Sequence, residues 1–140
     1  VVESFGGKKI DNLEDGLKII DILSLSVPLT KDTYNMIDFK KMKTMKKTAI
    51  IINTSRGGVV NEKDLNEAIN KKIIYGAGLD VFEKEPPDSN NPLLKNKNVI
   101  LSPHAATFTK ECLSNMSIQT AQNVIDFFQN KLKKEMIVEL

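Results

Sequence analysis

Short apolar segments alternate with helical patterns along this chain, and this alternation limits the possible folds more than any other feature. Each apolar segment has the length of a strand and is followed by polar, Gly or Pro residues. Alternating strands and helices predict an α/β fold, in which a parallel sheet is flanked by helices. The expected strands are Ile22–Val27, Ala49–Thr54, Ala77–Phe82 and Val99–Ser102, with a weaker candidate at Lys8–Ile10.

Residues that favour the N-cap position mark the expected helix starts, and apolar residues at helical spacing follow each of them. The pairs of cap and apolar face are Asn12 with Leu17 and Ile20, Asp38 with Phe39, Met42 and Met45, Asn61 with Leu65, Ala68 and Ile69, and Thr109 with Met116, Val124, Ile125 and Phe128.

Composition excludes several classes of protein. The 140 residues are 41% apolar, which is enough for one domain with a buried core. The net charge of +2 is spread over helix faces with interleaved acids, so we expect no nucleic-acid partner. We expect no membrane segment and no signal peptide, and therefore a cytoplasmic protein. The single cysteine, Cys112, cannot form an internal disulfide and is expected to be a small buried filler.

Charged residues follow the expected strands at the carboxyl ends, where ligands bind in open α/β sheets. Arg56 is the only arginine among 20 basic residues, and two glycines follow it. A guanidinium can hold a carboxylate through two parallel hydrogen bonds, so Arg56 is a candidate ligand for a small organic acid. A solubilising surface arginine is the alternative interpretation.

Two further strand ends carry an acid and the only histidine. Asp80 interrupts an apolar strand, so it must either cap a loop or bind a ligand amide. His104 follows the last strand, and Glu85 lies in a neighbouring loop. A carboxylate beside an imidazole favours the protonated ring, which suits an acid catalyst; a histidine satisfied by backbone is the alternative. One His and one Cys are too few for a metal site, and the G-x-S-x-G motif of a hydrolase is absent.

Four motifs, in order, resemble the C-terminal half of the D-isomer-specific 2-hydroxyacid dehydrogenases. They are INTSRGGVVNEKDL from residue 52, GAGLDVFEKEPP from residue 76, NPLL from residue 91 and NVILSPHAA from residue 98. The resemblance runs from Leu13 to Asp126 and includes the loop SVPLT at Ser26–Thr30.

The resemblance implies a function and a role for each matching residue. Arg56 would bind the substrate carboxylate and carbonyl, His104 would be the acid/base, and Glu85 would be its partner, so that these three form the catalytic set. Asp80 would bind the nicotinamide side of the cofactor. The full set implied to contact NAD, with NADP not excluded, is Val27, Thr54, Ser55, Arg56, Asp80, His104 and Ala106.

The glycine-rich fingerprint G-x-G-x-x-G of that family is absent from these residues. We therefore expect residues 1–108 to be the later part of an NAD-binding Rossmann domain, and residues 109–140 a helix and tail that return to a substrate domain. The chain, which begins at Val1, is expected to be part of a longer protein, to be inactive alone and to form a homodimer. D-3-phosphoglycerate, hydroxypyruvate or glyoxylate is the expected substrate. A non-catalytic, NAD-sensing corepressor or interaction module is the alternative.

Overall fold

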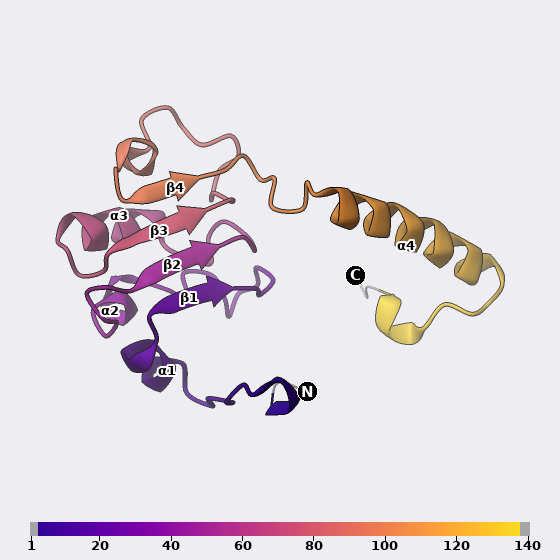
Figure 1. Cartoon of the computed structure of the whole chain (residues 1–140). Coiled ribbons are helices and arrows are strands. Elements are labelled where there is room, and N and C mark those ends of the chain that lie inside the picture. Colours follow the sequence, from indigo (N-terminus) through magenta and orange to yellow (C-terminus); the bar gives the residue numbers. More distant parts are fainter. Residues whose placement is uncertain (1–2, 138–140) are drawn as a thin grey trace. The chain divides into compact units, whose positions relative to one another are not determined.

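The computed structural model describes residues 3–137 and divides into two compact units, Val1–His104 and Ala105–Leu140. The predicted boundary at residue 108 lies close to this division, but the proposed return of residues 109–140 to a substrate domain stays a prediction. Figure 1 shows both units along the chain.

The first unit is built on a four-stranded parallel sheet with the order β1-β2-β3-β4. Its strands are β1 (Ile22–Leu25), β2 (Ile50–Asn53), β3 (Gly76–Leu79) and β4 (Val99–Leu101). The predicted α/β fold is confirmed (Figure 1). All four strands end before the sequence pattern does. The residues that follow the strands form the candidate site.

The weaker strand candidate at Lys8–Ile10 was wrong, because these residues are exposed and pair with no strand. Two lysines and one isoleucine leave a strand almost no apolar surface to bury, so pairing would gain little.

Three helices of the first unit begin at the predicted caps. They are α1 (Leu13–Ile19), α2 (Phe39–Met42) and α3 (Glu62–Asn70). The side chains of Asn12, Asp38 and Asn61 accept hydrogen bonds from backbone N–H groups of the first turn. Helix α2 stops at Met42, before the expected Met45. The Thr44 hydroxyl there donates to the carbonyl of Lys41, an interaction that competes with a continuing helix.

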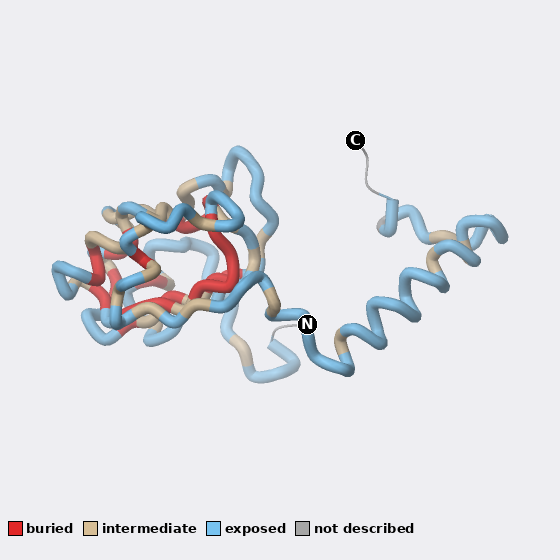
Figure 2. The backbone as a smooth tube through the Cα atoms, turned by 90° about the horizontal axis from the view of Figure 1, so that it is seen from above, coloured by how far each residue is buried: buried red, intermediate tan, exposed pale blue. Residues whose placement is uncertain are grey.

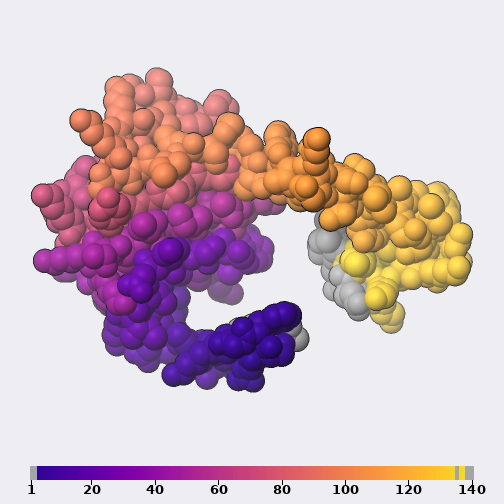
Figure 3. All heavy atoms as spheres, viewed as in Figure 1, coloured from indigo at the N-terminus to yellow at the C-terminus, as the bar shows by residue number. Residues whose placement is uncertain are grey.

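One face of the sheet and the helices enclose the core. Leu25, Ile51 and Leu79 are buried on this face, together with Leu17 of α1 and Leu65 of α3. The opposite face is open: Ile22 and Ile100, which point the other way in the strand alternation, are 62% and 80% exposed. Figure 2 shows the buried residues in red, and Figure 3 shows the heavy atoms of the first unit coloured from indigo to orange along the chain.

The second unit contains the long helix α4 (Lys110–Phe128), capped by the Thr109 hydroxyl, which accepts from the N–H of Cys112 at 3.1 Å. No residue of α4 is buried, and Cys112 is only partly covered, so the prediction that Cys112 is a buried filler was wrong.

The described residues also form three short 3-10 helices: η1 (Glu3–Phe5) and η2 (Pro92–Lys95) in the first unit, and η3 (Lys134–Met136) in the second. No helix among residues 3–137 is long and apolar enough to cross a membrane.

Candidate active site

The loop that carries Arg56 is shaped by Asn53, the last residue of β2. Asn53 is 2% exposed, and its amide makes three hydrogen bonds within the loop. The Oδ1 atom accepts from the N–H and the hydroxyl of Ser55, at 3.1 and 2.8 Å, and Nδ2 donates to the carbonyl oxygen of Arg56 at 2.9 Å. A buried amide with these bonds fixes the turn from which the Arg56 side chain projects.

The Arg56 side chain is exposed, and its Nη1 donates to the carbonyl of Ser55 at 2.7 Å. The structure brings it together with Val27, Thr54 and Ser55, whose contact with a cofactor stays a prediction. Together with Ser26, Pro28 and Leu29, they line a hollow of about 570 Å³ beyond the carboxyl ends of β1 and β2.

Gly57 brings the Arg56 loop against the loop that follows β3. A Cβ atom at this position would lie 1.8 Å from the carbonyl oxygen of Phe82 and 2.5 Å from the nitrogen of Glu83. Only glycine allows two backbones to approach this closely. The loop that holds Arg56 is therefore positioned by direct contact with the loop that holds Glu85.

Asp80 lies directly after β3 and is 3% exposed. Its N–H donates to the carbonyl of Asn53 at 3.0 Å, and its carbonyl accepts from the N–H of His104 at 2.9 Å. Its carboxylate oxygen Oδ1 accepts from the Ser102 hydroxyl at 2.5 Å. The backbone of Asp80 thus connects the loops that follow β2 and β4.

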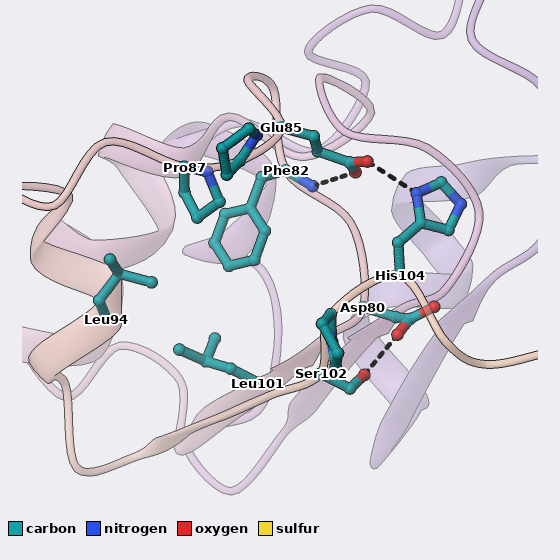
Figure 4. A pocket seen from close by; sticks show the side chains of 10 residues that line it. Asp80, Phe82, Glu85, Pro87, Leu94, Leu101, Ser102 and His104 are labelled. Atoms are coloured by element: carbon teal, nitrogen blue, oxygen red, sulfur yellow. Dashed lines mark hydrogen bonds and ion pairs between the residues drawn. The ribbon is translucent and has the colours of Figure 1, made fainter.

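The His104 ring and the Glu85 carboxylate lie within hydrogen-bond distance of each other, as the sequence predicted. Nδ1 of the ring lies 2.7 Å from Oε2 of Glu85, and Oε1 of the same carboxylate accepts from the Phe82 N–H at 3.0 Å. Figure 4 shows this chain of contacts. The hydrogen bond with His104, followed by the one from Phe82, holds the pKa of the Glu85 carboxyl below its ordinary value of 4.5.

The backbone of His104 has a φ of 53°, in the left-handed region that non-glycine residues rarely adopt. The hydrogen bond from its N–H to Asp80 helps to hold this conformation. Because Nδ1 faces Glu85, the second ring nitrogen, Nε2, points away from the carboxylate (Figure 4). The arrangement fixes one ring nitrogen and leaves the other oriented for proton exchange.

A second hollow, of about 520 Å³, lies between the loops after β3 and β4. Polar groups enter it from one side and apolar groups from the other, as Figure 4 shows. It is lined by Asp80, Glu85, Ser102 and His104 and by Phe82, Pro86, Pro87, Leu94, Leu101 and Pro103. A small polar molecule with an apolar ring or chain would match this lining.

The structure does not place all the predicted residues in one cavity. Arg56 lines the first hollow, whereas Asp80, Glu85 and His104 line the second. The Gly57 contact with Phe82 joins the loops of the two hollows. Ala106 belongs to the second unit, so its contact with a cofactor stays a prediction. No three His, Cys, Asp or Glu side chains among residues 3–137 are grouped as metal ligands.

Sequence reasoning missed Asn53 and Ser102. Asn53 carried a signal, because a polar residue directly after three isoleucines in a strand must have buried hydrogen-bond partners. Ser102 carried none, since a serine beside a proline is common in loops.

Residues 2–106 match the family model described as the D-isomer specific 2-hydroxyacid dehydrogenase, NAD binding domain. That match covers most of the chain and includes both hollows. The chain belongs to this family. The resemblance predicted from the four motifs is confirmed.

Relatives and solved structures agree with this assignment. A glyoxylate reductase of Korarchaeum cryptofilum is 46% identical over 125 residues, which are 89% of this chain and 38% of that protein. A D-3-phosphoglycerate dehydrogenase of Methanocaldococcus jannaschii is 38% identical over 137 residues, 98% of this chain and 26% of that protein. The NAD-complexed D-isomer specific 2-hydroxyacid dehydrogenase of Lactobacillus delbrueckii ssp. bulgaricus superposes with a TM-score of 0.78 at 32% identity, covering 88% of this chain and 42% of that one. The chain therefore spans less than half the length of these family members.

Proposed function

We propose that the protein containing this chain is an NAD-dependent oxidoreductase that interconverts a D-2-hydroxy acid and its 2-keto acid. The observation that carries the proposal is the pair of Glu85 and His104, 2.7 Å apart, beside a hollow in a domain of this family. An oriented imidazole with a carboxylate partner is suited to exchange the proton of a substrate hydroxyl.

Arg56 would hold the substrate. Its exposed guanidinium forms one hydrogen bond with its own loop, so it can turn to a ligand at small cost. A planar fork binds a carboxylate and can also polarise the neighbouring carbonyl of a 2-keto acid. In the reducing direction, the Nε2 proton of His104 would pass to the oxygen that becomes the hydroxyl. Glu85 would stabilise the protonated ring and keep Nδ1 facing away from the substrate.

The residues of both hollows fit a nicotinamide cofactor, which would supply the hydride. Val27, Thr54 and Ser55 lie beyond the carboxyl ends of β1 and β2, where dinucleotides bind in open parallel sheets. Asp80 presents a carboxylate to the second hollow, and a carboxylate can accept from the amide of nicotinamide. We assign NAD, with NADP not excluded, to these residues together with Arg56, His104 and Ala106.

Glyoxylate is the substrate that we propose first, because the Korarchaeum relative named glyoxylate reductase shares 46% identity. Hydroxypyruvate differs from it by one hydroxymethyl group. D-3-phosphoglycerate is the third candidate, supported by the relative with 38% identity. A corepressor or interaction module would not need Arg56 together with an oriented Glu85 and His104, so the catalytic function is favoured.

Activity of the full-length protein tests the proposal. NADH oxidation, followed by absorbance, should occur with glyoxylate or hydroxypyruvate. The reverse reaction should reduce NAD with the matching hydroxy acid. D-3-phosphoglycerate is assayed in that reverse direction alone. A protein that binds NADH but converts none of these acids would contradict the proposed function and favour a binding role.

We also propose a homodimer in the cytoplasm. Apolar side chains exposed on α4, such as Phe128 at 79%, and the open sheet face with Ile100 support association with other protein surfaces. The single cysteine is compatible with a reducing compartment. Light scattering on the purified full-length protein would measure the mass in solution, and a monomer would contradict the dimer.

A further inference from the structure

Ser102 forms a hydrogen bond that the proposed reaction does not use. Its hydroxyl lies 2.5 Å from Oδ1 of Asp80 (Figure 4), and a carboxylate can only accept, so the hydroxyl donates. The same residue is held by its backbone, because its N–H donates to the carbonyl of Leu79 at 2.9 Å. The hydroxyl is thus presented to Asp80 from a fixed position.

Asp80, which receives this bond, is 3% exposed. Both backbone groups of Asp80 are engaged, with Asn53 on one side and His104 on the other, so its Cα is fixed. What remains to be set is the rotation of the carboxylate about its side-chain bonds. A charge-assisted hydrogen bond to one named oxygen restricts that rotation. Ser102 therefore helps to orient the carboxylate of Asp80 toward the hollow.

Ser102 also belongs to the turn that positions His104. Pro103 separates the two residues, and the N–H groups on both sides of it bind consecutive carbonyls, those of Leu79 and Asp80. The hydroxyl of Ser102 adds a third connection between the same two segments. The carboxylate of Asp80 and the ring of His104 are consequently oriented from one turn.

We propose that Ser102 is a positioning residue that orients Asp80 toward the nicotinamide end of the cofactor. This inference rests on the proposed function, in which Asp80 binds the cofactor. Ser102 acts through Asp80 and need not touch the substrate. The consequence is that losing its hydroxyl should weaken cofactor binding far more than binding of the keto acid.

The test compares three variants of the full-length protein: Ser102→Ala, Ser102→Thr and the control Ser89→Ala. Ser89 is an exposed serine of the loop after β3 that lines neither hollow. The dissociation constant for NADH, measured by fluorescence titration, should rise about tenfold in Ser102→Ala. It should return to within about threefold of wild type in Ser102→Thr, which keeps the hydroxyl, and stay unchanged in Ser89→Ala. The KM for glyoxylate at saturating NADH should change little in all three.

A second measurement separates orientation of Asp80 from a merely structural role. In a double-mutant cycle, Ser102→Ala should have almost no effect on NADH binding once Asp80→Asn is present, because the carboxylate it orients has been removed. Additive effects would overturn the inference. So would a Ser102→Ala protein that unfolds at lower temperature but binds NADH like wild type. If wild-type protein binds no NADH, the proposed function itself fails; if wild type binds and Ser102→Ala binds equally well, only the role of Ser102 fails.

Discussion

Glu85 uses its two carboxylate oxygens on two different partners: Oε2 binds Nδ1 of His104 at 2.7 Å, and Oε1 accepts from the N–H of Phe82 at 3.0 Å. The second bond prevents the carboxylate from rotating away from the first. A histidine whose ring is held in this way keeps the same nitrogen directed to its partner through each protonation change. The two bonds together hold the Glu85 carboxylate in place against the His104 ring.

Replacing His104 with Gln should remove the proton exchange while preserving a polar side chain. In the full-length protein we expect kcat for glyoxylate reduction to fall by about 10²- to 10⁴-fold. The dissociation constant for NADH should change by less than about threefold, because the cofactor would be held mainly by other residues. Steady-state kinetics and NADH titration measure the two effects. Retention of wild-type kcat would show that another group exchanges the proton.

Arg56 should respond to the shape of its replacement as well as to its charge. Arg56→Ala is expected to lower kcat/KM for glyoxylate about 100-fold or more, since two charge-assisted hydrogen bonds are lost. Arg56→Lys should recover only part of this, because an ammonium cannot form the parallel pair. Lys31→Ala, which removes an exposed charge from the loop after β1, is the control and should leave kcat/KM unchanged. Equal kinetics for Arg56→Lys and wild type would contradict bidentate binding.

The stability of the protein in acid should depend on Glu85. Folding lowers the pKa of the Glu85 carboxyl. Its carboxylate therefore stabilises the protein at pH values above the ordinary pKa of 4.5, and this contribution is lost as the pH falls through the lower pKa of the folded protein. The difference in unfolding free energy between wild type and Glu85→Gln should therefore narrow as the pH falls below the ordinary pKa of 4.5.

Denaturant titrations at several pH values measure this difference for Glu85. In a His104→Gln background the narrowing should be smaller, since the largest cause of the lowered pKa is removed. A difference that stays constant as the pH falls well below 4.5 would show that folding does not lower the pKa of Glu85.

Most of the fold could be predicted because it depends on local patterns. The four strands follow from runs of apolar residues, and the caps at Asn12, Asp38, Asn61 and Thr109 follow from short-range hydrogen bonds between each side chain and its own helix. The failure at Lys8–Ile10 shows the limit of such patterns. A strand also needs a neighbour and a face to bury, and three residues cannot reveal either.

The candidate site could be predicted in its residues but not in its geometry. Glu85 and His104 meet because parallel strands bring their carboxyl ends to one edge, which the sequence implies. The separation of Arg56 into another hollow depends on how two loops pack, through the backbone of Gly57 and Phe82. Asn53, directly after three isoleucines, signals a buried and hydrogen-bonded side chain but does not reveal its partners, and no residue pattern distinguishes Ser102.

Asn53 should be important for both stability and substrate binding. Asn53→Ala leaves the partly buried N–H of Ser55 and the carbonyl of Arg56 without their partner, and we expect a loss of about 2 kcal/mol in unfolding free energy. Asn53→Asp should keep the bonds to Ser55 but place a carboxylate against the Arg56 carbonyl. Both variants should raise the KM for glyoxylate, whereas Asn90→Ala in an exposed loop should not. Denaturant unfolding and kinetics measure these effects; an unchanged KM in a destabilised Asn53→Ala would restrict Asn53 to a structural role.

Gly57 provides the sharpest test of the connection between the two hollows. Gly57→Ala would place a Cβ 1.8 Å from the Phe82 carbonyl, so the loops of Arg56 and Glu85 must separate. We expect a loss of about 3 kcal/mol in unfolding free energy, together with lower kcat and higher KM for glyoxylate. Gly16→Ala in α1 is the matched control: its nearest neighbour would be 3.6 Å away, and alanine favours a helix, so stability should stay equal or rise by up to about 1 kcal/mol. Calorimetry and kinetics compare the two variants. If the Gly57→Ala protein were less stable but kept the wild-type kinetic constants, the two loops would hold Arg56 and His104 independently of each other.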